Sequence, residues 1–153
     1  MVRGLNFLII LFILLGLIGC SLDENDHIDT GFIPTGEWVD NFGGTYTISE
    51  NDLEFDDGYG FTQFIGTIET AVDFSPGSGV LIVKITSSNT GITPGNFIGI
   101  YYKDFSASFI FLANAVDEFY AIIETNTLDN AKSTFNVDTV GTHVTHWGSG
   151  YTK

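Results

Sequence analysis

The chain has 153 residues, of which 19 are acidic and five are lysine or arginine, so its formal net charge at pH 7 is −14. A surface of this sign repels phosphate backbones and anionic lipid headgroups, which disfavours nucleic-acid binding and electrostatic docking to a membrane. A single cysteine excludes an intrachain disulfide. Stability must therefore come from packing, for which 14 phenylalanines and six tyrosines are available.

Residues 1–19 are predicted to be a secretory signal peptide. Arg3 is followed by an almost continuous apolar run from residue 5 to residue 18 and then by the small residue Gly19, which is the layout of a cleaved export signal. A permanent transmembrane helix is the alternative, but it needs about 20 apolar residues and this run is nearer to about 14. The run is too short to favour a membrane span.

The only cysteine, Cys20, stands directly after this apolar run. Leu17-Ile18-Gly19-Cys20 resembles the bacterial lipobox, which implies that a diacylglycerol is attached to Cys20 and that the peptide is cut before it. Several acyl chains at one residue hold a protein durably on a membrane. The alternative is a buried or free thiol near an ordinary cleavage site.

Residues 20–35 are predicted to tether the lipid to the folded part. Four acidic residues lie between positions 23 and 29, large apolar residues are few, and the stretch ends in Pro34-Thr35, as in a flexible linker. Residues 36–153 are enough for one domain with a hydrophobic core and too few for two.

Short β-type runs separated by turn residues follow, and no helical pattern alternates with them. They lie at residues 45–49, 53–55, 60–68, 80–86, 97–102, 108–116 and 119–125. Asp57-Gly58 predicts a two-residue hairpin between the second and third runs. Asp117-Glu118 predicts a tight turn before the last of them.

One short helix is predicted at residues 128–135, with Thr127 as its cap and Asp129 near the positive end of its dipole. A last strand is predicted at residues 141–147. Eight or nine strands with local connections must close or fold over to hide their edges. We therefore predict an all-β fold, an antiparallel up-and-down barrel of about eight strands with one short helix before the last strand. A β-sandwich is the alternative.

Two of the predicted strands, 97–102 and 108–116, are apolar on both faces. One face should fill the barrel, while the other covers the late helix, neighbouring loops or a partner. Side chains alternate along a strand, so at most one of Tyr101 and Tyr102 can line the interior.

No metal site is predicted. If Asp52 were the first ligand of an EF-hand loop, Asp57 would stand where that loop requires glycine. The acids at positions 52, 54 and 56 instead fit the solvated face of a half-buried strand. His143 and His146 are three residues apart, so on a strand they would point to opposite faces and could not bind one ion together.

No catalytic residue and no cofactor are predicted either. The sequence contains no nucleophile elbow, phosphate-binding glycine loop or metalloprotease motif. Spacing selects no pair of glycosidase carboxylates among the candidates Glu69, Asp73, Glu118 and Glu124. An enzyme is therefore not expected.

Gly36-x-Trp38 at the first strand, followed by a meander, a late helix and a final strand, resembles the lipocalin (calycin) plan. This resemblance implies that Trp38 packs at one end of the barrel. Five segments resemble small lipid-anchored proteins of spirochaete-type bacteria with a lipocalin-like barrel, namely residues 36–49, 65–69, 77–86, 95–115 and 131–148. That resemblance implies a fold and a location and no particular activity.

The sequence thus predicts a non-enzymatic lipoprotein of the cell envelope, held by lipid on Cys20 at the periplasmic face or the outer cell surface. Its barrel is expected to bind a small apolar ligand or to present a recognition surface, with residues 75–79 and 88–96 as the candidate loops. A structural or antigenic surface protein that contacts other proteins is the second hypothesis. An envelope hydrolase is the third, and nucleic acid is not an expected partner.

Overall fold

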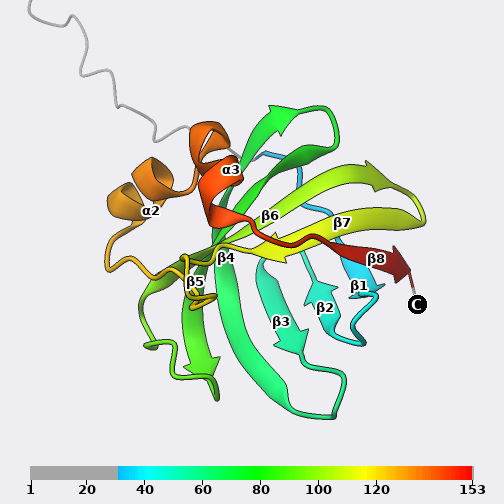
Figure 1. The fold of residues 1–153 in the computed structure, drawn as a ribbon, viewed down its shortest axis with the longest axis horizontal. Helices are drawn as coiled ribbons and strands as arrows, with labels where there is room; N and C mark the ends of the chain where they lie inside the picture. The colour runs from blue at the N-terminus through cyan, green and yellow to red at the C-terminus, as the bar shows by residue number, and fades with distance from the viewer. Residues whose placement is uncertain (1–30, 153) are drawn as a thin grey trace, which may run out of the picture.

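The computed structural model describes residues 31–152, which form a closed antiparallel barrel of eight strands (Figure 1). The strands follow one another around the barrel in chain order, and β1 pairs with β8 to close it. Their bounds are β1 (Gly36–Val39), β2 (Thr45–Ile48), β3 (Asp52–Asp56), β4 (Thr62–Ser75), β5 (Ser78–Ser88), β6 (Phe97–Ser106), β7 (Phe109–Asn114) and β8 (Gly148–Thr152). The predicted up-and-down barrel is confirmed, and the sandwich alternative is not.

The predicted signal peptide (1–19), the lipidation residue Cys20 and the first part of the tether lie outside the described residues. Within residues 31–152, no helix has both the length and the apolar character that a membrane span requires.

Strands β5 and β6 bury side chains on both faces. Along β6, Ile98, Ile100 and Tyr102 belong to the core inside the barrel, whereas Phe97 and Tyr101 belong to a second core outside it. Period-two alternation of the strand produces this division. The prediction that at most one of the two tyrosines lines the interior is confirmed.

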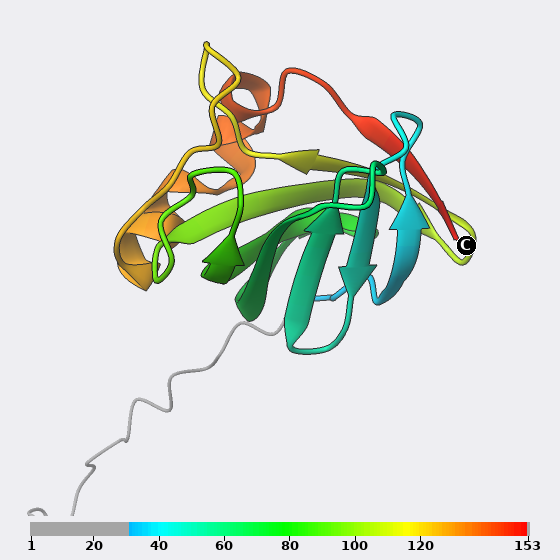
Figure 2. The same cartoon turned by 90° about the horizontal axis from the view of Figure 1, so that it is seen from below.

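The outer face of β5 and β6 is covered by a helical segment of the same chain. It consists of α2 (Leu128–Thr134), the 3-10 helix η1 (Val137–Thr139) and α3 (Val140–His143), which lie on one side of the barrel wall (Figures 1 and 2). Thr127 caps α2 by accepting a hydrogen bond from the backbone N–H of Asn130 at 3.2 Å. The predicted capped helix is confirmed. The late helix covers the outer face of the predicted strand at residues 97–102, as expected, whereas in the predicted strand at residues 108–116 only Ala115 belongs to the outer core.

The predicted last strand at residues 141–147 is wrong. Residues 140–143 form α3, and the strand that closes the barrel lies at residues 148–152. This strand begins Gly148-Ser149-Gly150, a poor strand pattern by propensity. Space is tight here, because a Cβ on Gly150 would lie 3.1 Å from Ile110 and 3.3 Å from Trp38. Tertiary packing therefore decides the position of β8.

Two predictions about local connections are also wrong. Strands β3 and β4 form the expected antiparallel hairpin, but residues 57–61 make a longer loop than the two-residue turn. Residues 119–125 form only isolated bridges, Val116 with Ile122 and Phe97 with Thr125. The bridge to Phe97 lies just beyond Ile100, where the pairing of β6 with β7 ends, and it does not extend into a strand.

Residues 31–35, which were expected to belong to the tether, pack against one end of the barrel. The N–H of Gly31 donates to the carbonyl of Ala71 at 2.9 Å, and the N–H of Phe32 donates to Asp73 at 3.0 Å. The Tyr102 hydroxyl contacts both Phe32 O and Asp73 Oδ1 at 2.8 Å. Ile33 packs against the inner core. We call this the closed end of the barrel.

Candidate functional site at the open barrel end

Side chains occupy the interior of the barrel. The inner core contains 16 buried apolar or aromatic residues from strands β1 to β7 and one loop, including Trp38, Tyr46, Leu53, Phe64, Ile100 and Tyr102. The pockets described below therefore lie at the surface of the barrel and at its mouth.

Trp38, the residue singled out by Gly36-x-Trp38, lies near the closed end and is 1% exposed. Its ring packs edge-on against Phe105 with 5.7 Å between ring centroids. The indole Nε1–H donates to the carbonyl of Pro34 at 3.0 Å. Trp38 thus joins residues 31–35 to the barrel core.

Four loops gather at the opposite end, which we call the open end: residues 40–44, 57–61, 89–96 and 115–127. Figure 2 shows them along the upper side of the barrel, whereas residues 31–35 lie on its lower side. Asn89 bridges two of the loop regions by donating its side-chain N–H to Thr62 O at 2.8 Å. Gly58, at φ 80°, lies directly against the backbone of Gly43 and has no room for a side chain.

Three of these loops contain the same local motif, an aspartate two residues before an exposed aromatic residue. The carboxylate accepts the backbone N–H of that aromatic residue in each loop: Asp40 from Phe42 at 2.8 Å, Asp57 from Tyr59 at 2.9 Å and Asp117 from Phe119 at 2.8 Å. Side-chain acceptance two residues along the chain defines an Asx turn. Each turn fixes the loop so that its aromatic residue points outward.

The aromatic residues in these turns are exposed to an unusual degree. Phe42 is 69% exposed, Tyr59 is 84% exposed and Phe119 is 79% exposed, and Phe61 and Tyr120 are exposed in the same loops. Large apolar side chains gathered on a surface mark an interaction site more often than chance exposure does. None of these residues was singled out from the sequence, although the spacing Asp-x-aromatic occurs there at all three places.

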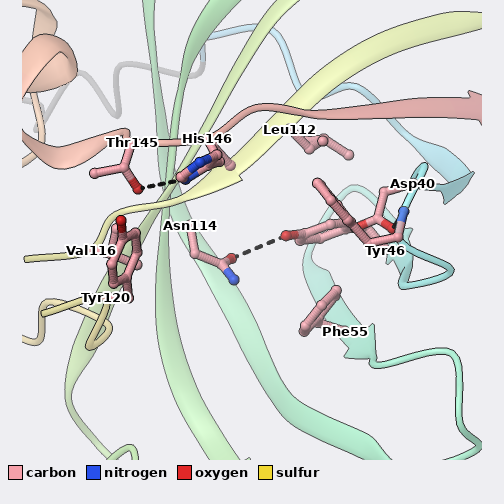
Figure 3. A pocket seen from close by; sticks show the side chains of 12 residues that line it. Asp40, Tyr46, Phe55, Leu112, Asn114, Val116, Tyr120, Thr145 and His146 are labelled. Carbon is pink, nitrogen blue, oxygen red and sulfur yellow. Dashed lines mark hydrogen bonds between the residues drawn. The ribbon is translucent and has the colours of Figure 1, made fainter.

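A pocket of about 310 Å³ opens at the mouth of the barrel between loops 40–44 and 115–127 and residues 145–148 (Figure 3). We call it the mouth pocket. Figure 3 shows Asp40, Tyr46 and Phe55 on one side of it and Tyr120 and His146 on the other. Its remaining lining residues are Phe42, Leu112, Ala113, Asn114, Val116, Thr145 and Gly148.

Tyr46 and Asp40 form the inner side of the mouth pocket. The Tyr46 hydroxyl donates to Asn114 Oδ1 at 3.3 Å, and its ring lies 4.5 Å from that of Phe55. Burial raises the pKa of Tyr46 well above its ordinary range, and the negative charge of Asp40 raises it further. Tyr46 is therefore a neutral hydroxyl and Asp40 supplies the charge on this side.

Tyr120 faces the mouth pocket from an unfavourable backbone conformation. Its φ is 65°, a value that costs about 1–2 kcal/mol for a residue with a Cβ. The turn is held because Asp117 Oδ1 accepts the N–H of Ala121 at 3.0 Å as well as that of Phe119. Strain of this kind concentrates at functional sites, and here it positions an aromatic ring at the mouth.

The loops proposed from the sequence as a recognition surface do not lie together. Residues 89–96 belong to the open end, whereas the turn between β4 and β5 at Pro76-Gly77 lies at the closed end, where Phe105 donates its N–H to Gly77 O at 3.1 Å. Strand connections alternate between the two ends of an up-and-down barrel, so these two loops cannot share one surface. The acids of β3 follow the predicted alternation, with Leu53 fully buried and Asp52 exposed.

The His143 and His146 rings pack against different residues. The strand that was expected to point them to opposite faces is absent. The His143 ring lies 6.3 Å from that of Phe135, and the His146 ring lies 5.9 Å from that of Tyr120. Within residues 31–152, no group of three or more histidine, cysteine, aspartate or glutamate side chains is arranged to hold a metal ion.

His143 predicts a pH dependence of stability. Burial lowers its pKa, and its Nδ1 is buried with no hydrogen-bond partner in the described part of the chain. His143 therefore binds protons more readily in the unfolded chain than in the folded one. The stability that comes from its neutral form is complete above about pH 6.5 and is lost as the pH falls through the lowered folded pKa. His143→Gln should therefore lose less stability than the unmodified chain between about pH 7 and about pH 5 in urea titrations. The exposed His146→Gln is the control; an equal effect of both changes would contradict this role of His143.

Comparison of the chain with protein-family models, with curated proteins and with solved structures gives no match. The geometry of the open end is therefore the basis for assigning a function.

Proposed function

We propose that this protein is a non-enzymatic lipoprotein of the cell envelope that uses the open end of its barrel as a recognition surface. The lipobox-like residues that end at Cys20 support the anchor. The resemblance to lipid-anchored spirochaete-type proteins supports the same location, at the periplasmic face or the outer cell surface. The partner that this surface recognises would be another macromolecule of the cell envelope or of its surroundings.

The observation that carries this proposal is the exposure of Phe42, Tyr59 and Phe119 at one end of the barrel while the chain enters at the other. A lipid attached through residues 20–30 would hold the barrel by its closed end. Eleven residues span at most about 40 Å when fully extended, so the protein would stay close to the membrane with its open end free to turn away from it.

A small apolar ligand inside the barrel is the less favoured alternative. The inner core residues already fill the space between the strands, and the mouth pocket lies at the small end of the about 300–1,000 Å³ that ligand pockets usually have. The mouth pocket, at about 310 Å³, suits one side chain or a fragment of a partner. A purely structural or antigenic role gives no reason for three aromatic residues fixed by identical turns.

The anchor is tested by Cys20→Ser in cells supplied with an alkyne-labelled fatty acid. Because the thiol is the acceptor of the diacylglycerol in lipobox-type processing, the variant should carry no label and should be uncut or released from the membrane. Gel fluorescence of the immunoprecipitated protein measures this outcome. Undiminished labelling of Cys20→Ser would overturn the lipid anchor.

The recognition surface is tested by cross-linking from defined positions in intact membranes. p-Benzoylphenylalanine at position 59, in an open-end loop, should give discrete protein adducts on irradiation. The same group at position 151 on β8, where Tyr151 is 56% exposed, is the matched control and should give few. Equal adducts from both positions, or adducts only from position 151, would contradict recognition at the open end.

A further inference from the structure

The mouth pocket combines aromatic walls with one carboxylate. Tyr46, Phe55, Phe42 and Tyr120 contribute rings to its lining, and Asp40 is its only acidic lining residue. The faces of aromatic rings attract cations, and the attraction grows when the cation is withdrawn from water. The mouth pocket therefore has the side chains of a receptor for an organic cation.

Only one of the two carboxylate oxygens of Asp40 accepts hydrogen bonds from the described residues. Its Oδ1 accepts the N–H groups of Phe42 and Gly44, both at 2.8 Å, whereas Oδ2 has no hydrogen-bond partner in the part of the chain that the structure describes. No lysine or arginine lines the mouth pocket. An incoming cation would thus meet a carboxylate oxygen that is held in place and not yet neutralised.

The surroundings of the mouth pocket are negatively charged, like Asp40 itself. Asp56, Asp57, Asp117 and Glu118 lie in or next to the open-end loops, and the loops 40–44, 57–61 and 115–127 contain no lysine or arginine. The three outward aromatic residues lie among these acids. A surface that is apolar and negative together complements a polypeptide that is apolar and basic together.

We propose, building on the recognition surface above, that the open end binds a lysine- or arginine-containing polypeptide segment of a partner protein, with one basic side chain in the mouth pocket against Asp40. The rings of Tyr46, Phe55 and Tyr120 contact the stem and head of that side chain. Phe42, Tyr59 and Phe119 contact apolar residues that flank it.

The test uses the full-length protein purified in nonionic detergent and three short labelled peptides, in which leucine alternates with lysine, with glutamine or with glutamate. Fluorescence anisotropy should show saturable binding that is tightest for the lysine peptide and weaker at high salt. Equal binding of the lysine and glutamine peptides would overturn the cationic assignment.

Asp40→Asn is the decisive variant. Asparagine keeps a side-chain oxygen for the two N–H groups of the turn while it removes the charge, so the loop is preserved. Affinity for the lysine peptide should fall about tenfold, the effect of losing one charge-assisted contact. Asp104→Asn removes the same charge from an exposed position on β6 near the closed end and should leave affinity unchanged. An equal loss from both variants would show that only the overall charge matters and would overturn the proposal.

Tyr120→Gly separates binding from folding. Glycine adopts the positive φ of Tyr120 without strain, so the thermal unfolding midpoint should stay the same or rise while affinity for the lysine peptide falls. Unchanged affinity would remove Tyr120 from the site.

Tetramethylammonium distinguishes a polypeptide from a small cation. It should not displace the lysine peptide at concentrations comparable to the peptide's own, and displacement there would assign the mouth pocket to a small quaternary amine instead. Cross-linking at position 59 is independent of this chemistry. Adducts at position 59 without preference for the lysine peptide would reject the cationic partner and leave the proposed function standing, and absence of both would reject both.

Discussion

Trp38→Ala is expected to lower the free energy of unfolding by about 3–5 kcal/mol, the usual effect of truncating a buried aromatic residue. Trp38 is 1% exposed and packs against Phe105. The variant also loses the hydrogen bond from Nε1–H to Pro34 O, which holds residues 31–35 against the closed end. Urea unfolding followed by circular dichroism measures the effect.

Tyr59→Ala is the matched control, because Tyr59 is 84% exposed and an exposed truncation should change stability by less than about 0.5 kcal/mol. Equal unfolding midpoints for the two variants would show that Trp38 does not support the core.

Phe135→Ala should also cost about 3–5 kcal/mol, by a different route. Phe135 is fully buried at the end of α2 and belongs to the outer core with Tyr101 and Ala131. Its ring lies directly on Gly99 of β6, where an added Cβ would be 2.7 Å from ring atoms. The variant leaves a cavity between the helical segment and the barrel wall.

Hydrogen exchange distinguishes the two truncations. Phe135→Ala should increase exchange in α2 and η1 more than in β2 and β3, because the latter contact only the inner core. Val137→Ala, at a position that is 58% exposed in the same helical segment, should change stability by less than about 0.5 kcal/mol. Uniform destabilisation of all strands by Phe135→Ala would contradict a separate outer core.

The barrel could be predicted because its determinants are local. Alternation along the strands, turn residues between them and the absence of alternating helices are visible in any single stretch of the sequence. The cap at Thr127 follows from its side-chain oxygen before a helix, and the opposite orientations of Tyr101 and Tyr102 follow from the two-residue period of a strand. These features agree with the structure because no distant contact opposes them.

Predictions that depended on distant contacts were wrong. Residues 141–147 have the β-branched pattern of a strand, yet Val140 and Val144 pack into the outer core and the chain turns as α3. Gly148 and Gly150 have low strand propensity, yet they lie where an added Cβ would crowd Asp40, Ile110 and Trp38. Propensity is a weak prior when a neighbour decides how much space a side chain has.

The candidate site could not be predicted for a related reason. Each Asp-x-aromatic turn looks like an ordinary loop in the sequence, and Asp40, Asp57 and Asp117 are far apart along the chain. Only the alternation of loops between the two ends of the barrel brings them together. Both the register of the barrel and the absence of a strand at residues 119–125 were needed to place Tyr120 at the mouth.

The docking of residues 31–33 also determines how the fold would bear mechanical load. A pull on residue 30 would be transmitted through Gly31 and Phe32 to Ala71 and Asp73 of β4, and through the Tyr102 hydroxyl to β6. These strands are long and paired along most of their length. The seam between β1 and β8 has only two paired positions and would bear only the part of that force that residues 33–35 pass along the backbone to β1. When the protein is pulled from its N-terminal side, the contacts with β4 and β6 would therefore reduce the load on the pairing of β1 with β8.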